Sequence, residues 1–141
     1  MNPGTRPSPN AFQTHPTRYR HLRLSCEGEV ATLVIAVQPT EVARPGYELK
    51  LNSFDLAVDI ELADALQRLV FEHPETRCVV LTGGLERVFS AGANIGMLAS
   101  SPLALKVNFS KYSSETLLAL EYFEKFTLSC LLYTSPSPRD S

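Results

Sequence analysis

The sequence is short of the features that define three large protein classes: paired cysteines, an excess of basic residues and long apolar runs. Its three cysteines, Cys26, Cys78 and Cys130, are far apart and odd in number, which argues against a disulfide framework or a zinc site. A net charge of −2 provides no attraction for nucleic acid, and no polybasic cluster indicates a membrane surface. No apolar run approaches the ~18 residues of a membrane span, and residues 1–10 lack the apolar segment of a signal peptide. We therefore expect a cytoplasmic protein without metal, nucleic-acid or membrane partners.

The length and composition predict one folded, soluble domain. The chain has 141 residues, of which 44% are hydrophobic and 20% are charged, and this is enough for a real core. Residues 1–17 hold four prolines and few apolar side chains, so we expect a flexible N-terminal tail. His15 and His21 lie in or near this tail without further ligands at metal-binding spacing, and we expect both to be ordinary surface histidines.

Apolar patterns in the first half predict two strands and a helix. Residues 19–24 alternate roughly and are followed by a hairpin turn signal, Glu-Gly-Glu. Residues 30–37 are almost all apolar and mostly β-branched, which predicts a strand buried on both faces. Between residues 53 and 73, apolar side chains recur at spacings of three and four, so we expect a helix capped by Ser53 or Asn52.

The charged and titratable residues of this helix are expected to be structural. Asp59 and Glu61 are two residues apart, so their carboxylates point away from each other on a helix, and Asp59 is expected to be solvated or salt-bridged. His73 precedes Pro74, and the residue before a proline resists the helical conformation. We therefore expect His73 to end the helix rather than to act in catalysis.

The second half of the chain predicts one more strand and further helical structure. Residues 77–82 are an apolar run of strand length, residues 95–100 indicate a short helix or turn, and residues 102–126 carry a longer helical pattern. The order of elements is therefore strand, strand, helix, strand, loop and helix.

The segment from Cys78 to Ile95 joins a predicted strand to a predicted helix through small residues. Its Gly83-Gly84 pair lacks the Lys and Ser/Thr of a phosphate loop, and no G-x-G-x-x-G dinucleotide pattern is present. The small residues at 90–93 allow a ligand to approach backbone N–H groups. By spacing alone, a plain tight turn between strand and helix explains them equally well.

Four segments resemble the crotonase (enoyl-CoA hydratase/isomerase) superfamily, whose signature is close to F-x-A-G-A-D-[IL]. They are Val30–Val37, Leu51–Ser53, Val79–Gly83 and Phe89–Ile95. The resemblance extends over about residues 19–126. It implies an α/β fold in which residues 18–128 are a crotonase-like domain, truncated to the N-terminal part of the ββα spiral.

Further segments look like the benzoyl-CoA-dihydrodiol lyase branch of this superfamily. They are Arg44–Asp64, Phe71–Pro74, Ala91–Asn94, in which Asn94 replaces the aspartate of typical hydratases, and Lys106–Phe109. This likeness implies a lyase that opens the ring of 2,3-epoxybenzoyl-CoA by hydrolysis, with release of formate, in aerobic benzoate degradation. The alternatives are an enoyl-CoA hydratase or isomerase, and a partial CoA-binding module without turnover. No cofactor beyond the CoA of the substrate is implied, and the full-length protein is expected to be a homo-oligomer.

The same resemblance implies a site built on residues 91–95. Members of the superfamily hold the thioester oxygen of an acyl-CoA between two backbone N–H groups, one of which aligns with the N–H of Ala93. Ala91, Gly92 and Ile95 are expected to contact the acyl-CoA, and a side chain at position 92 is expected to crowd the thioester. In the family, the second donor and the acid/base carboxylates lie beyond the segment present here. The 141 residues alone are therefore expected to be inactive.

The last residues differ in character from the rest. Residues 129–141 break the helical pattern, and Cys130–Asp140 is the translation of a nucleotide string that resembles a transposon-based sequencing adapter. We expect this segment to be a library artefact, the alternative being a natural tail rich in Ser and Pro.

Overall fold

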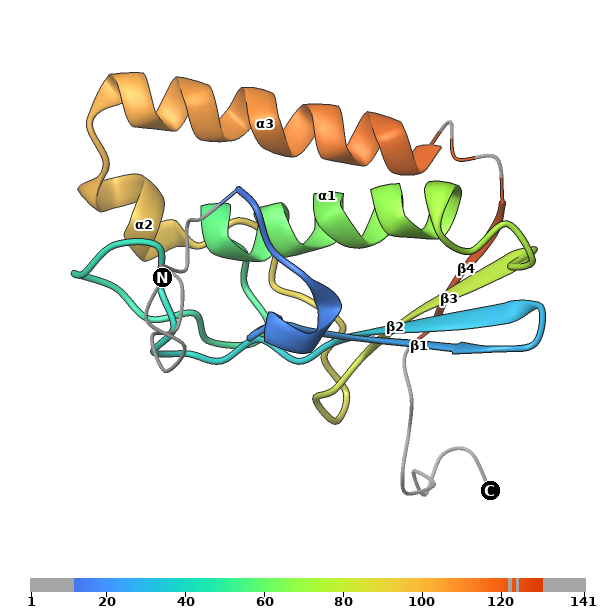
Figure 1. The fold of residues 1–141 in the computed structure, drawn as a ribbon. Coiled ribbons are helices and arrows are strands. Elements are labelled where there is room, and N and C mark those ends of the chain that lie inside the picture. Colours follow the sequence, from blue (N-terminus) through green and yellow to red (C-terminus); the bar gives the residue numbers. More distant parts are fainter. Residues whose placement is uncertain (1–11, 122, 124, 131–141) are drawn as a thin grey trace, which may run out of the picture.

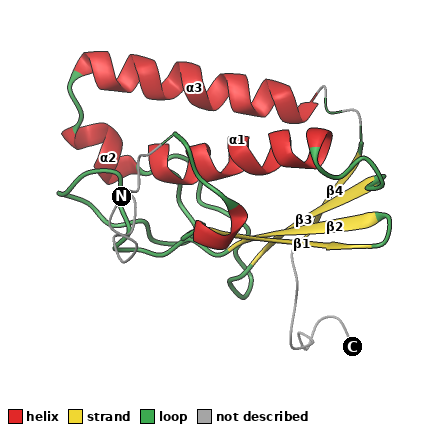
Figure 2. Ribbon diagram, viewed as in Figure 1, coloured by secondary structure: helices red, strands yellow, loops and turns green. Residues whose placement is uncertain are grey.

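A four-stranded sheet covered by helices makes up the part of the chain that the computed structural model describes, residues 12–121, 123 and 125–130. The elements in order are η1 (Pro16–Arg18), β1 (Leu22–Glu27), β2 (Val30–Ile35), α1 (Leu56–Phe71), β3 (Cys78–Gly83), α2 (Ile95–Ser100), α3 (Leu103–Glu121) and β4 (Phe126–Cys130). The sheet order is β1-β2-β3-β4, with β1 and β2 antiparallel and the other neighbours parallel. Figure 1 shows α1 between the sheet and α3, and Figure 2 shows the loops near α2 gathered beyond one end of the sheet. The expected α/β architecture is confirmed.

One face of the sheet carries the core. Along β2, Ala31, Leu33 and Ile35 are buried, whereas Val30 on the other face is 43% exposed. The expectation that this strand is buried on both faces is therefore wrong for the described residues. The helices cover one face, and side chains alternate between the faces of a strand.

The cap of α1 is not the expected one. Asp55 is the N-cap, because its Oδ1 accepts hydrogen bonds from the N–H groups of Ala57 at 2.9 Å and Val58 at 3.3 Å. Asn52 has a left-handed backbone, with φ of 54°, and lies before the helix. The helix ends at Phe71, just ahead of the His-Pro pair that was expected to stop it.

Two polar side chains that were expected at the surface, His21 and Asp59, are buried. His21 is 1% exposed, and its Nδ1 accepts from the Gln38 N–H while its Nε2–H donates to the carbonyl of Glu41. Burial lowers the pKa of His21. Asp59 is only 2% exposed, so the expected solvated face is also wrong. These positions lie where α1 meets other elements, and helical spacing alone does not show what covers each face.

Glu61 ties the N-terminal segment to α1. Its carboxylate accepts three backbone hydrogen bonds, from the N–H groups of Arg20 and His21 at 2.9 Å and of Leu22 at 3.1 Å. Such a fork of backbone donors satisfies a buried charge. The start of β1 is therefore fixed against α1 by one side chain.

The C-terminal part contains a strand where helix was expected. The helix predicted to reach residue 126 ends at Glu121, and β4 then pairs in parallel with β3, with Ser129 opposite Leu81. The expected domain boundary after residue 128 falls inside β4, and residues 131–141 lie outside the described residues. Residues 1–11 of the expected tail also lie outside them. Within the described part, no helix combines the length and hydropathy needed to cross a membrane.

Candidate functional site

Ala93 lies in a short parallel bridge with Phe54, just before α2. The Phe54 N–H donates to the Gly92 carbonyl and the Asn94 N–H donates to the Phe54 carbonyl, both at 2.8 Å. The Gly92 carbonyl and the Ala93 N–H belong to the same trans peptide and therefore point in opposite directions. Because this carbonyl accepts from Phe54, the Ala93 N–H points away from Phe54. Among the described residues, no hydrogen bond uses this N–H. The bridge therefore presents a fixed and unoccupied backbone donor.

Asn52 fastens this bridge to the end of β2. Its side chain is 1% exposed, and its Oδ1 accepts from the Val37 N–H at 2.9 Å. Its Nδ2 donates to the carbonyls of Ile35 at 2.7 Å and Phe89 at 3.1 Å. The left-handed backbone at position 52 suits asparagine. Sequence reasoning considered this residue only as a helix cap and as part of a resembling segment.

Ser90 and Gly92 shape the turn that leads to Ala93. The Ser90 hydroxyl donates to the Asn52 carbonyl at 2.7 Å and accepts from the Gly92 N–H at 3.0 Å. Gly92 has φ of 79°, and a Cβ placed there would meet nothing within 4 Å. Within the described residues, glycine is therefore required at 92 by backbone conformation, not by crowding.

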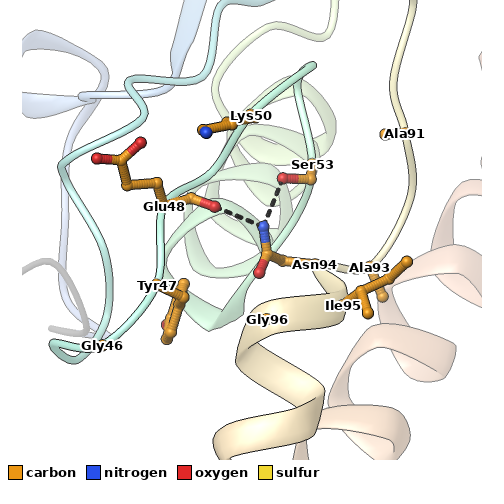
Figure 3. A pocket seen from close by; sticks show the side chains of 10 residues that line it. All are labelled: Gly46, Tyr47, Glu48, Lys50, Ser53, Ala91, Ala93, Asn94, Ile95 and Gly96. Atoms are coloured by element: carbon orange, nitrogen blue, oxygen red, sulfur yellow. Dashed lines mark hydrogen bonds between the residues drawn. The ribbon is translucent and has the colours of Figure 1, made fainter.

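Asn94 is the N-cap of α2. Its Oδ1 accepts from the Met97 N–H at 2.8 Å, and its Nδ2 donates to the Glu48 carbonyl at 2.7 Å and to Ser53 Oγ at 2.9 Å. Figure 3 shows the two donated bonds reaching across to the segment that contains Glu48 and Ser53. An aspartate has no donor for the Glu48 carbonyl, so the amide at this position has a specific structural use.

These residues surround a pocket of about 680 Å³. It is lined by Gly46, Tyr47, Glu48, Lys50, Ser53, Ala91, Ala93, Asn94, Ile95 and Gly96. Of the four predicted site residues, Ala91, Ala93 and Ile95 thus come together, whereas Gly92 is not among the lining residues. The wall from Gly46 to Ser53 was not predicted as part of the site, although it lies in a segment that carries the family resemblance.

The charges and the aromatic ring of the pocket come from this second wall. Glu48 and Lys50 line it with exposed side chains. The Tyr47 hydroxyl donates to Asp55 Oδ2 at 2.7 Å, and burial together with this bond raises the pKa of Tyr47. The Arg44 guanidinium lies 6.0 Å from the centroid of the Tyr47 ring. Among the described residues, no three His, Cys, Asp or Glu side chains gather in a way that could hold a metal ion.

The fold and this loop architecture define the class of protein. Residues 42–131 match the enoyl-CoA hydratase/isomerase family, and the chain belongs to this family. The enoyl-CoA hydratase from Thermoplasma volcanium shares its fold with a TM-score of 0.61 and 27% identity, over 77% of this chain and 39% of that one. An enoyl-CoA hydratase from Shewanella pealeana gives a TM-score of 0.65 at 20% identity, over 81% and 40% of the two chains.

A curated relative is more similar in sequence. Over 110 residues the chain is 54% identical to the benzoyl-CoA-dihydrodiol lyase of Aromatoleum evansii. The matched part is 78% of this chain and 20% of that lyase, so the chain spans about a fifth of the relative's length. The expected resemblance to the superfamily and to its lyase branch is confirmed.

Proposed function

We propose that the pocket at Ala93 binds the thioester group of an acyl-CoA. We further propose that the whole protein is a benzoyl-CoA-dihydrodiol lyase that opens the ring of 2,3-epoxybenzoyl-CoA and releases formate. The observation that carries the first proposal is the unpaired Ala93 N–H at the wall of a pocket of about 680 Å³. The 54% identity to a lyase of that name supports the second.

The chemistry of this donor follows from its fixed direction. A thioester oxygen gains negative charge when the acyl group becomes enolate-like. An N–H that already points at it stabilises this charge by about 3–4 kcal/mol per donor. Phe54 holds the peptide on the opposite side, so the Ala93 N–H needs no rearrangement to act. In this proposal, the second donor and the proton-transferring carboxylates belong to the rest of the whole protein, and the present chain binds without turnover.

Two other functions remain as alternatives, an enoyl-CoA hydratase or isomerase and a CoA-binding module without catalysis. Asn94 favours the lyase over a typical hydratase, because the signature of typical hydratases has an aspartate at this position. The CoA of the substrate is the only cofactor in the proposal. A cytoplasmic location and a homo-oligomeric whole protein stay predictions.

A matched pair of ligands tests the binding proposal. Benzoyl-CoA carries the thioester carbonyl, and S-benzyl-CoA is a thioether with the same ring and CoA but no carbonyl oxygen. We expect calorimetry to show about fivefold tighter binding of benzoyl-CoA, the worth of one net hydrogen bond. The Ala93 amide signal in a ¹⁵N–¹H spectrum should shift with benzoyl-CoA only. Equal affinities and an unmoved Ala93 signal would contradict the proposal.

Turnover separates the enzyme hypotheses. For the whole protein we expect formate release from 2,3-epoxybenzoyl-CoA and little hydration of a 2-enoyl-CoA. The reverse pattern would establish the hydratase alternative. Measurable ring opening by the 141-residue chain alone would refute its assignment as a binding segment.

A further inference from the structure

The Asn94 side chain connects the two walls of the pocket. One wall is the segment from Gly46 to Ser53, and the other runs from Ala91 into the first turn of α2. The Asn94 amide, 8% exposed, donates to both Glu48 and Ser53 on the first wall and caps α2 on the second. Figure 3 shows it between them.

We propose that Asn94 is a positioning residue that fixes the distance between these walls and thereby the place of the Ala93 N–H against a bound acyl group. The inference rests on the proposed acyl-CoA site and adds a residue that acts through Ala93 rather than on the substrate.

Both sides of residue 94 are held, so it moves with Ala93 as one unit. Its backbone N–H donates to the carbonyl of Phe54, the residue after Ser53, at 2.8 Å. The two walls also pack closely against each other at Gly96. A Cβ on Gly96 would lie 3.2 Å from Asn94 Oδ1 and 3.3 Å from Tyr47 Cβ. The first turn of α2 thus has little room to shift against the Tyr47 wall without breaking the amide bonds.

The connection needs an amide rather than a carboxylate. Asparagine supplies two N–H donors and a carbonyl acceptor on one side chain, and all three roles are used here. A carboxylate oxygen in place of Nδ2 would face the Glu48 carbonyl oxygen, and two acceptors repel each other. Asn94→Asp therefore keeps the size and the cap but pushes the walls apart.

The test compares Asn94→Asp with wild type, using Ser100→Ala as a matched control. Ser100 lies in the same helix, its hydroxyl donates to the Gly96 carbonyl at 2.9 Å, and it does not line the pocket. The measured quantity is the affinity ratio of benzoyl-CoA to S-benzyl-CoA. We expect a ratio of about five in wild type and Ser100→Ala and about one in Asn94→Asp. A wild-type ratio of one overturns the acyl-CoA site itself. A preserved ratio in Asn94→Asp overturns only this inference.

A pH series separates positioning from simple loss of structure. Once protonated, the carboxyl group introduced by Asn94→Asp regains a donor for the Glu48 carbonyl. The ratio in this variant should therefore recover as the pH falls toward about 5, since burial raises the pKa of a carboxyl group. Glu48 and Lys50 line the pocket and Asp55 holds the Tyr47 hydroxyl, so wild type is measured over the same range to account for these groups. A loss that is independent of pH would contradict the inference. If the variant does not fold, Ser53→Ala removes one acceptor of the amide, and an unchanged ratio in that variant overturns the proposal.

Discussion

Replacing Asp59 by asparagine should stabilise the protein at neutral pH. Asp59 lies in α1 with 2% exposure, and its Oδ2 has no hydrogen-bond partner among the described residues. Burial raises the pKa of Asp59 to about 7, the Ser113 hydroxyl on α3 opposes this, and the Asp55 carboxylate one turn earlier adds to it. The fold therefore holds a carboxyl group that resists ionisation.

The magnitude follows from the difference between the folded and ordinary pKa values. They are about 7 and 3.8, and each pH unit between them corresponds to about 1.36 kcal/mol. A folded pKa above the unfolded one means that the folded state binds the proton more tightly. The favourable contribution is thus complete below about pH 3.8 and is lost as the pH rises to about 7. Relative to an uncharged asparagine, ionised Asp59 costs roughly 4 kcal/mol above that range.

Urea unfolding of wild type and Asp59→Asn at a series of pH values measures this cost directly. We expect the difference in free energy of unfolding to be near zero at about pH 4 and to grow to a few kcal/mol in favour of the variant at about pH 8. Asp64→Asn is the control on the same helix. It loses the charge that pairs with Arg68 and weakens the hydrogen bond from the Tyr19 hydroxyl, so it should destabilise instead. A difference for Asp59→Asn that does not change with pH would refute the reasoning.

Three further changes test other parts of the structure. Glu61→Ala should destabilise by at least about 3 kcal/mol, because the N–H groups of His21 and Leu22 lose their buried acceptor. Glu61→Gln keeps one oxygen and should cost less. Equal unfolding curves for wild type and both variants would contradict this role of Glu61. Gly92→Ala should cost about 1 kcal/mol because the backbone has φ of 79°, and an unchanged melting temperature would show that the turn adapts. Leu117→Lys should reduce self-association in sedimentation, because Leu117 is 58% exposed on α3. A wild-type chain that is already monomeric at high concentration would overturn that expectation.

Apolar patterning was sufficient for the regular elements near the core. The apolar run of β2 and the three- and four-residue spacing in α1 both reflect burial, which a linear pattern records directly. The same patterns failed at the ends of elements. Asp55 caps α1 because the loop before it brings Ala43 and Tyr47 to its second oxygen, and no local rule distinguishes it from Ser53. The strand β4 was missed because its pairing with β3 is non-local.

The burial of charged groups was also outside the reach of the sequence. Helical geometry assigns Asp59 and Glu61 to faces of α1 but does not show which element covers each face. The N-terminal segment, about 40 residues away in sequence, covers Glu61, and α3 covers Asp59. Three backbone N–H groups donate to the Glu61 carboxylate, whereas Asp59 Oδ2 has no partner among the described residues. This difference depends on how whole elements pack against α1.

The sequence by itself indicated the family and the strand-to-helix turn, because the motif from Phe89 to Ile95 is contiguous and can be read without the fold. The resemblance to the family, rather than the spacing of the small residues, then pointed to the N–H of Ala93. Only the tertiary structure decided what makes that N–H available and what faces it. Phe54 occupies the carbonyl on the other side of the same peptide, and Asn94 holds the Glu48 wall across the pocket. Both contacts join residues about 40 positions apart in sequence. They form only because the packing of α1 on the sheet brings the two loops together in space.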